Sequence, residues 1–387
     1  MEEKIKLSGV FVAGTLVMIA VGIAALLAGF LQDPGRGWAN VLLNNVYFVS
    51  LSVGALLFLS IQRVTHSGWS AGFLRVPEAM GGFLPVAALL FLLMIPGAGS
   101  LYHWSHADAV AHDPLLAHKA PFLNLPFWII RMGVYFGLWI LLAVLLRRIS
   151  LKEDREGGLG PFRRGELLAR IFIFVVIITF SLAMIDWVMS IDAHWYSTIF
   201  AVKNFVAAFH HASIVIAFIV MLMNRRGHFP FLNKSHLADF SRYIFMLCII
   251  WGYFWFAEFM LIWYGNIPEE TAYFIPRIRG EGWGLFFYAN IAVNWFLPFV
   301  LLMPLALARN KTVLKIVIPF LIAGQFIDLY IQIFPGTVGT QVLGFQEIGT
   351  FIGYAGLFML VTGYMLSRAN LYPVNHPFLE ESRAHHT

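Results

Sequence analysis

Long apolar runs, separated by short polar segments, dominate the hydropathy pattern of this chain. A transmembrane helix needs about 20 consecutive apolar residues, and we count ten such runs. We therefore predict an all-α integral membrane protein. Because no shift in composition marks a boundary, residues 1–387 are expected to form a single polytopic domain. The expected spans are residues 8–31, 40–62, 80–98, 124–147, 167–191, 197–224, 239–264, 283–308, 312–333 and 346–368.

The composition agrees with this prediction and limits the chemistry. The chain is 59% hydrophobic and 12% charged, and a soluble domain of this size needs more charge to cover its surface. We attribute the net charge of +5 to loops on one membrane face, not to nucleic-acid binding. The single cysteine, Cys248, excludes an intrachain disulfide, a Cys-x-x-Cys-His haem attachment and an all-cysteine iron–sulfur site. Any redox centres that the protein serves must therefore belong to partner subunits.

The distribution of Lys and Arg predicts the orientation, because cytoplasmic loops carry an excess of both. With both termini in the cytoplasm, 20 of the 26 Lys and Arg residues fall in inside segments and 4 in outside loops. The remaining two, Arg131 and Lys203, lie within spans. We therefore place both termini in the cytoplasm, together with residues 148–166, which we expect to be a solvated connector.

Two outside segments carry polar side chains. Residues 186–200 form a corner between spans, where Asp186 and His194 stand among Trp and Tyr residues that suit the membrane interface. The loop at 99–122 carries four histidines, whose spacing fits no compact zinc ligand set. We therefore predict no metal. These histidines are His103, His106, His112 and His118.

Charged residues also fall inside the predicted spans. Asp186, Glu258 and Asp328 each lie five or six residues from the outer end of their span, and Arg131 and Lys203 fall at a similar depth. Ionisable groups within the membrane are costly, and they mark proton relays or ligand pockets. Since three acids and two bases can also neutralise one another, a structural ion network remains the alternative to a proton-handling site.

His210 and His211 fall near mid-membrane in the sixth span. Neighbouring helical residues point about 100° apart, so the two rings cannot both ligate one haem iron. No other span offers a histidine that could serve as the second axial ligand. A b-type haem is therefore not expected. The two histidines either form hydrogen bonds between helices or provide a step in a proton path.

Several motifs resemble one known family. They resemble the quinol-oxidoreductase membrane subunits of bacterial alternative complex III, which are related to the NrfD-type subunits of polysulfide reductase. Helices five to nine match closely and the ten-helix plan matches loosely. The motifs are Asp186-Trp187-Val188-Met189-Ser190, His194-Trp195-Tyr196-Ser197-Thr198-Ile199-Phe200, Glu258 with Ile262-Trp263-Tyr264-Gly265-Asn266-Ile267-Pro268, Asn294-Trp295 with Pro298-Phe299, and Asp328-Leu329-Tyr330 before Pro335.

The resemblance implies two four-helix bundles, helices 2–5 and 6–9, with two flanking helices. It implies a bacterial plasma-membrane complex that oxidises menaquinol or another quinol. Electrons would pass to iron–sulfur clusters and c-type haems in partner subunits. The chain length and Trp195-Tyr196-Ser197-Thr198 resemble the ActF branch. The implied partners are a homologous ActC-like subunit, iron–sulfur and c-type cytochrome subunits, small membrane subunits and lipids.

Three functions remain open at this point. The first is a quinol or proton-handling subunit, the second a scaffold without its own quinol site, and the third a secondary transporter. The transporter is disfavoured because paired helices broken by Gly or Pro are missing from the predicted spans. The candidate site residues are Asp186, His194, Glu258, Asp328, Arg131, Lys203, His210 and His211.

Overall fold

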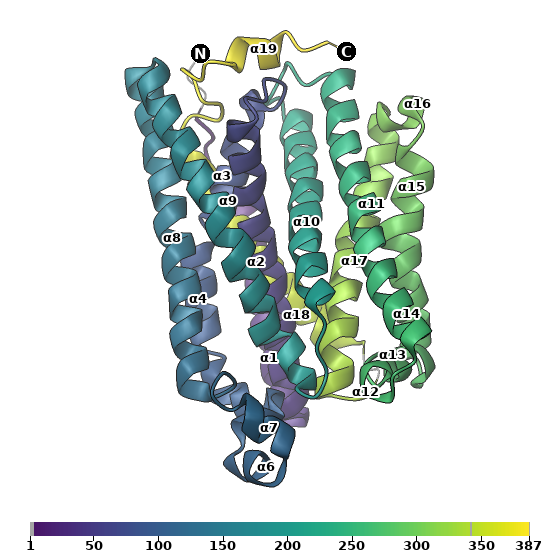
Figure 1. Cartoon of the computed structure of the whole chain (residues 1–387). Coiled ribbons are helices and arrows are strands. Elements are labelled where there is room, and N and C mark those ends of the chain that lie inside the picture. The colour runs from purple at the N-terminus through teal and green to yellow at the C-terminus, as the bar shows by residue number, and fades with distance from the viewer. Residues whose placement is uncertain (1–3, 341–342, 387) are drawn as a thin grey trace.

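The computed structural model describes residues 4–340 and 343–386. Within these ranges ten helices or helix pairs are long and apolar enough to cross a membrane, which confirms the all-α membrane fold. They run side by side along one axis, and both chain termini lie at the same end (Figure 1). The spans are α1 (Gly9–Gln32), α2 (Pro34–Val64), α3 with α4 (Arg75–Gly81 and Leu84–Leu92), α8 (Leu125–Glu156), α9 (Leu159–Trp187), α10 (Thr198–Arg225), α11 (Lys234–Gly265), α14 with α15 (Trp283–Ile291 and Leu297–Leu302), α17 (Lys311–Thr337) and α18 (Phe345–Ser367).

The helices form two bundles that meet along α2 and α10. The first bundle contains α2, α3 with α4, α8 and α9, and the second contains α10, α11, α14 with α15, and α17. Every residue in the most apolar stretch of α2 is buried. At the contact between the bundles, a Cβ atom on Gly54 would lie 2.1 Å from the carbonyl oxygen of Ala208. Only glycine therefore lets the two backbones come this close.

The flanking helices α1 and α18 pack mainly against each other. A Cβ atom built on Gly22 of α1 would lie 2.3 Å from the Cα atom of Gly353 in α18. Small residues at helix interfaces allow this approach, and the resulting van der Waals contacts drive helix association in membranes. The pair of α1 and α18 also packs against α2 and α3, on one side of the bundles.

The segment at 148–166, predicted to be a solvated connector, is largely helical and mixes exposed residues with buried ones such as Ser150 and Glu153. Helix α8 continues to Glu156, α9 begins at Leu159, and only Gly157 and Gly158 separate them. Both glycines have positive φ angles, 65° and 74°, which other residues rarely adopt. The extension of α8 persists because its Glu153 is buried and accepts a hydrogen bond from Arg63.

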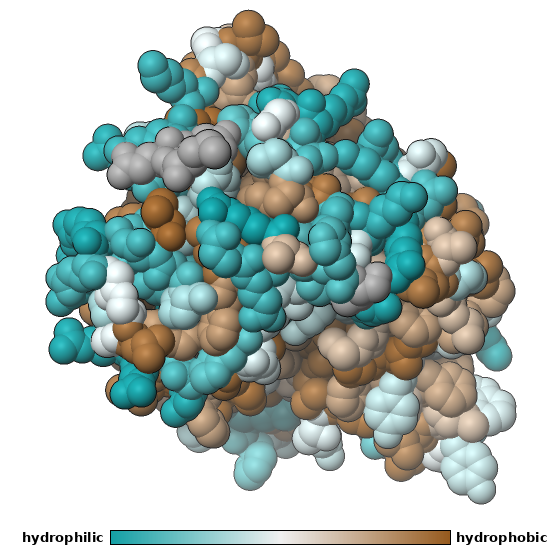
Figure 2. All heavy atoms as spheres, turned by 90° about the horizontal axis from the view of Figure 1, so that it is seen from above, coloured by the Kyte–Doolittle hydropathy of each residue, from teal (hydrophilic) through white to brown (hydrophobic). Residues whose placement is uncertain are grey.

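Short elements complete both ends. The end opposite the termini carries α6 and α7 below the first bundle and α12 and α13 below the second (Figure 1). Hydrophilic residues gather over the end that carries the termini, with hydrophobic residues around its rim (Figure 2). The short helices are α5 (Ala98–Leu101), α6 (Ala107–His112), α7 (Pro114–Lys119), α12 (Pro268–Thr271), α13 (Phe274–Arg279), α16 (Leu305–Ala308) and α19 (Leu379–Arg383), the 3₁₀ turns are Ala71–Phe73, Ile95–Gly97, His103–Ser105 and Met189–Asp192, and a π turn spans Ala292–Phe296.

Candidate functional site

In the first bundle, Asp186 forms a closed ion pair with Arg131. The Nε of Arg131 donates to Oδ2 of Asp186 at 2.8 Å, and Nη2 donates to Oδ1 at 2.7 Å. The hydroxyl of Tyr135 also donates to Oδ2, at 2.8 Å. Both carboxylate oxygens are thus satisfied by a bidentate guanidinium, the strongest kind of side-chain pairing. Asp186 is 1% exposed, so the pair is shielded from solvent.

The remaining faces of Arg131 are also occupied. Its Nη1 donates to the carbonyl oxygen of Phe122 at 2.9 Å. Its guanidinium lies 3.9 Å from the ring centroid of Phe122 and 4.4 Å from that of Phe127, which adds cation–π attraction. The Arg131–Asp186 pair is therefore built as a structural link between α8 and α9.

In the second bundle, Lys203 and Glu258 form a looser pair. The Nζ of Lys203 on α10 lies 3.7 Å from Oε2 of Glu258 on α11, too far for a hydrogen bond. Both side chains are at most 5% exposed. Among the described residues, Oε1 of Glu258 has no hydrogen-bond partner. The carboxylate of Glu258 therefore retains capacity to accept a proton or a hydrogen bond.

Asp328 on α17 is held by neutral donors. Asn290 donates to Oδ1 at 2.8 Å and Gln332 donates to Oδ2 at 3.0 Å. Within the described part of the chain, no Lys, Arg or His is ion-paired with Asp328. Each of the two aspartates thus binds a side chain from the preceding span of its own bundle. Asp186 binds the cation Arg131, whereas Asp328 binds the neutral amide of Asn290. Among the described residues, Asp328 therefore has no positive charge paired with it.

A chain of amides leads from Asp328 towards mid-membrane. Asn294 donates to Oδ1 of Asn290 at 2.5 Å, and Gln325 donates to Oδ1 of Asn294 at 2.9 Å. Gln325 in turn lies 3.5 Å from Nδ1 of His210. Asn294 belongs to the π turn at Ala292–Phe296, and such turns are frequent at functional sites. The chain therefore connects α14, α17 and α10 through buried polar groups.

The two histidines face different neighbours. His210 points to α17 through Gln325, whereas the ring of His211 packs edge-on against Tyr47 of α2 with centroids 4.3 Å apart. Both residues are buried, and Nε2 of each lacks a hydrogen-bond partner among the described residues. Only His210 joins the chain of amides.

His194 lies apart from the buried groups. Its side chain is 59% exposed, and its Nε2 contacts Oδ2 of Asp113, the N-cap of α7. The hydrogen bond from His194 and those from the backbone of Leu116 and Leu115 lower the pKa of the Asp113 carboxyl. His194 therefore fastens the outer loop to the corner and does not face the acids in the spans.

Arg277 was not singled out in the sequence, yet it organises the outer end of the second bundle. Pro335 lacks the N–H that would bond to the carbonyl oxygen of Ile331, and the Nε of Arg277 donates to that oxygen at 3.0 Å. Nη2 of Arg277 pairs with Asp192 at 2.9 Å, and the guanidinium stacks 3.4 Å from the ring centroid of Tyr273. Pro335 was the only signal in the sequence, because a proline inside a helix leaves one backbone carbonyl without its usual N–H donor.

Tyr273 is a buried phenol beside Arg277 at this end of the second bundle. Burial raises the pKa of its phenol, Arg277 lowers it, and the carboxylates of Asp192, Glu258 and Asp328 raise it further. The ring of Trp195 stacks on Tyr273 with centroids 3.9 Å apart. The corner motif thus packs on the segment between α12 and α13 through Trp195.

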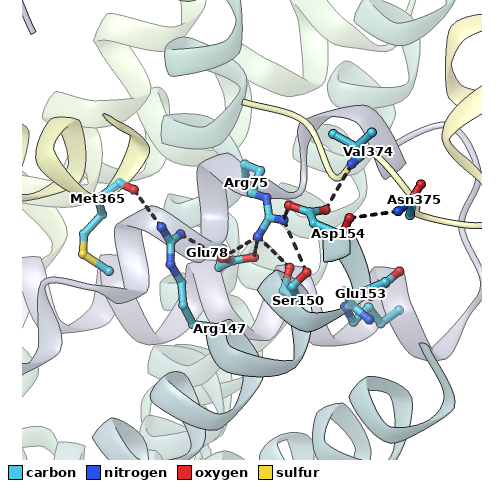
Figure 3. A network of polar contacts seen from close by, with 10 residues as sticks. Arg75, Glu78, Arg147, Ser150, Glu153, Asp154, Met365, Val374 and Asn375 are labelled. Carbon is cyan, nitrogen blue, oxygen red and sulfur yellow. Dashed lines mark hydrogen bonds and ion pairs between the residues drawn. The ribbon is translucent and has the colours of Figure 1, made fainter. Parts of the chain in front are cut away.

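A second polar network lies at the end that carries the termini, and sequence reasoning missed it as well. Arg75 donates to Glu78 at 2.9 Å, to Ser150 at 2.7 Å, and also contacts Asp154 (Figure 3). Asp154 accepts a hydrogen bond from the backbone N–H of Val374 at 3.1 Å. The network therefore ties α3 and α8 to the segment after α18. The i, i+3 spacing of Arg75 and Glu78 was its only local signal.

Comparison of the sequence with protein-family models and with curated proteins finds no match. In residues 4–340 and 343–386, no group of three or more His, Cys, Asp or Glu is placed to hold a metal ion. The fold and these contacts define a multi-pass membrane protein with two ion-pair networks and, in its second bundle, two buried acids without a close cation partner in the described part of the chain.

Proposed function

We propose that this chain is a proton-handling membrane subunit of a multisubunit quinol oxidoreductase, of the ActF type found in alternative complex III. The observation that carries the proposal is the contrast between the acids. Asp186 is neutralised by bidentate Arg131, whereas Asp328 is held by amides alone and Glu258 keeps an unpaired oxygen. Buried carboxylates without a tight cation partner are suited to exchanging protons.

The chemistry of quinol oxidation makes use of such groups. Each quinol releases two protons with its two electrons, and a proton acceptor must lie within hydrogen-bond reach of the hydroxyl. Oε1 of Glu258 offers an acceptor in the outer third of the second bundle. Asn290, Asn294 and Gln325 form a buried polar lining between Asp328 and His210, which are the two titratable groups at its ends. Menaquinol, when bound, supplies the electrons and protons.

The proposed assembly follows from the small number of cysteines available in this chain to ligate redox cofactors. Its only cysteine is the buried Cys248, so iron–sulfur clusters and c-type haems belong to partner subunits. We propose an ActC-like subunit, iron–sulfur and cytochrome subunits and small membrane subunits as partners in the bacterial plasma membrane. Purification of the tagged chain from its native membrane should bring down haem and iron. A lone chain that oxidises menaquinol unaided contradicts this assembly.

The experiment that tests the function compares three amide substitutions in the purified complex. Glu258→Gln and Asp328→Asn keep size and hydrogen bonding but remove the titratable proton, so we expect quinol turnover or proton release to fall by about tenfold or more with assembly intact. Asp186→Asn is the matched control, and it should reduce assembly instead. Normal turnover and proton yield in an assembled Glu258→Gln/Asp328→Asn complex would rule the proposal out.

The scaffold remains the second candidate, and the closed networks favour it. Arg131 and Asp186 satisfy each other and link α8 to α9, and the hydrogen bonds of Arg75 to Glu78 and Ser150 link α3 to α8. A scaffold predicts that all three amide substitutions affect assembly and that the surviving complex turns over normally.

A further inference from the structure

A groove of about 490 Å³ opens at the contact between the flanking helices and the second bundle. Its walls come from the segment before α1 and from α1, α2, α10, α17 and α18, and neither Glu258 nor Asp328 lines it. Its volume falls in the range of small-molecule sites, about 300–1,000 Å³. The lining is largely aromatic and aliphatic, with Tyr47, Phe48, Phe351 and Phe358 at its inner wall.

The groove extends from the middle of the molecule to the end that carries the termini. Along α18 its lining runs from Phe351 to Leu366, a rise of about 22 Å at 1.5 Å per residue. This exceeds half of the roughly 30 Å hydrocarbon core of a bilayer. Phe218 and Met359, which also line the groove, are 40% and 39% exposed, so the groove is open sideways to the membrane.

The mouth of the groove is basic. Lys6 and Arg226 line it, and both are exposed. Neither forms an ion pair with a carboxylate in the described part of the chain. Basic pockets between transmembrane helices attract anionic lipid head groups. A neutral quinone ring offers no negative charge to these two cations, whereas a phosphodiester does.

We propose that this groove holds one acyl chain of an anionic phospholipid, with its phosphate bound between Lys6 and Arg226. The apolar length suits the chain, and the paired cations suit the phosphate. The lipid would occupy the space between α1, α18 and α10, which is lined by residues of both the flanking pair and the second bundle. This binding is independent of quinol chemistry, so its test involves no measurement of turnover.

The test is lipid binding to the full-length protein, purified with its bound subunits and stripped of lipid in a non-ionic detergent. Native mass spectrometry would compare phosphatidylglycerol and phosphatidylcholine with identical acyl chains. We expect phosphatidylglycerol to bind more tightly. Since each surface cation contributes about 1 kcal/mol to anionic lipid binding, Lys6→Gln/Arg226→Gln should weaken it on the order of 30-fold.

The matched control is Arg163→Gln/Arg164→Gln, which removes two exposed cations from α9 at the same end of the molecule. It should leave phosphatidylglycerol binding unchanged. Equal binding of the two lipids, or an equal loss in both double variants, would overturn the proposal. Displacement of phosphatidylglycerol by menaquinone, with affinity for menaquinone unaffected by Lys6→Gln/Arg226→Gln, would assign the groove to a quinone instead.

Discussion

At the scale of single residues, the contrast between Asp186 and Asp328 decides how the buried charges are interpreted. The five charged residues within the spans do not form one cluster. Arg131 satisfies both oxygens of Asp186, Lys203 stands 3.7 Å from Glu258, and Asp328 receives only amide donors. The pair of Arg131 and Asp186 in the first bundle corresponds to the structural ion network, whereas proton handling by Glu258 and Asp328 in the second bundle stays a prediction.

Asp186→Asn should destabilise the protein strongly. The change leaves Arg131 buried without a counter-charge, and breaking a buried pair from one side costs about 3–5 kcal/mol. Thermal unfolding followed by size-exclusion chromatography would measure the loss. Asp186→Asn/Arg131→Gln removes both charges and should recover part of it, so a double variant that is no better than Asp186→Asn would contradict the pairing.

His376 should make the C-terminal segment sensitive to acid. Burial, with smaller contributions from the nearby charges of Arg63 and Arg75, lowers the pKa of its imidazole to about 3. The unfolded chain binds a proton near pH 6.5 and the folded chain does not, so stability is complete above about pH 6.5 and falls towards pH 3. The slope from this one group is at most about 1.4 kcal/mol per pH unit.

The measurement is the thermal midpoint at several pH values between 7.5 and about 5. His376→Phe removes the titratable ring and keeps an aromatic group beside Phe162 and Phe378. We expect a shallower decline in this variant. An unchanged pH dependence would show that His376 does not carry the effect.

At the scale of helices, glycine contacts and prolines decide which elements can pair. The flanking pair rests on the approach of Gly22 to Gly353, and the two bundles meet at Gly54. In α17, Pro335 frees a carbonyl that Arg277 captures from another element. The long extension of α8 carries polar contacts of Ser150 and Glu153 to other helices.

Gly22→Leu should separate α1 from α18. The new side chain would meet the backbone of Gly353 at a distance that no real Cβ contact tolerates, and overpacking costs about 1–3 kcal/mol or more. Gly14→Leu is the control on the same helix, because nothing lies within 4 Å of a Cβ atom there. We expect a lower thermal midpoint for Gly22→Leu alone. Equal effects of the two substitutions would contradict the close packing of these helices.

At the scale of the whole molecule, polar networks secure both ends of the bundle. Arg277 joins the corner to the outer end of α17, and Arg75 joins α3, α8 and the segment after α18 at the other end. Both termini lie at the end where most Lys and Arg residues fall. The positive-inside rule predicts that this end faces the cytoplasm.

Cysteine labelling in intact cells would test this orientation. After Cys248→Ser, single cysteines would replace Glu156 at the terminal end and Asp108 in the outer loop, whose side chains are 57% and 94% exposed. A membrane-impermeant maleimide should label Asp108→Cys and spare Glu156→Cys. The opposite pattern would reverse the topology. Ser150 is unsuitable as a probe because it is buried against Arg75.

The sequence by itself determined the number of spans, and it placed three acids within them. Both depend on local quantities, since each span requires its own run of about 20 apolar residues and satisfies its own backbone hydrogen bonds. Only the tertiary structure decided which acid receives a cation. Arg131 and Asp186 lie 55 positions apart, and Asn290 and Asp328 lie 38 apart. The partner of each acid depends on which helix faces meet, and that follows from packing of the whole bundle, to which close approaches such as Gly54 on Ala208 contribute.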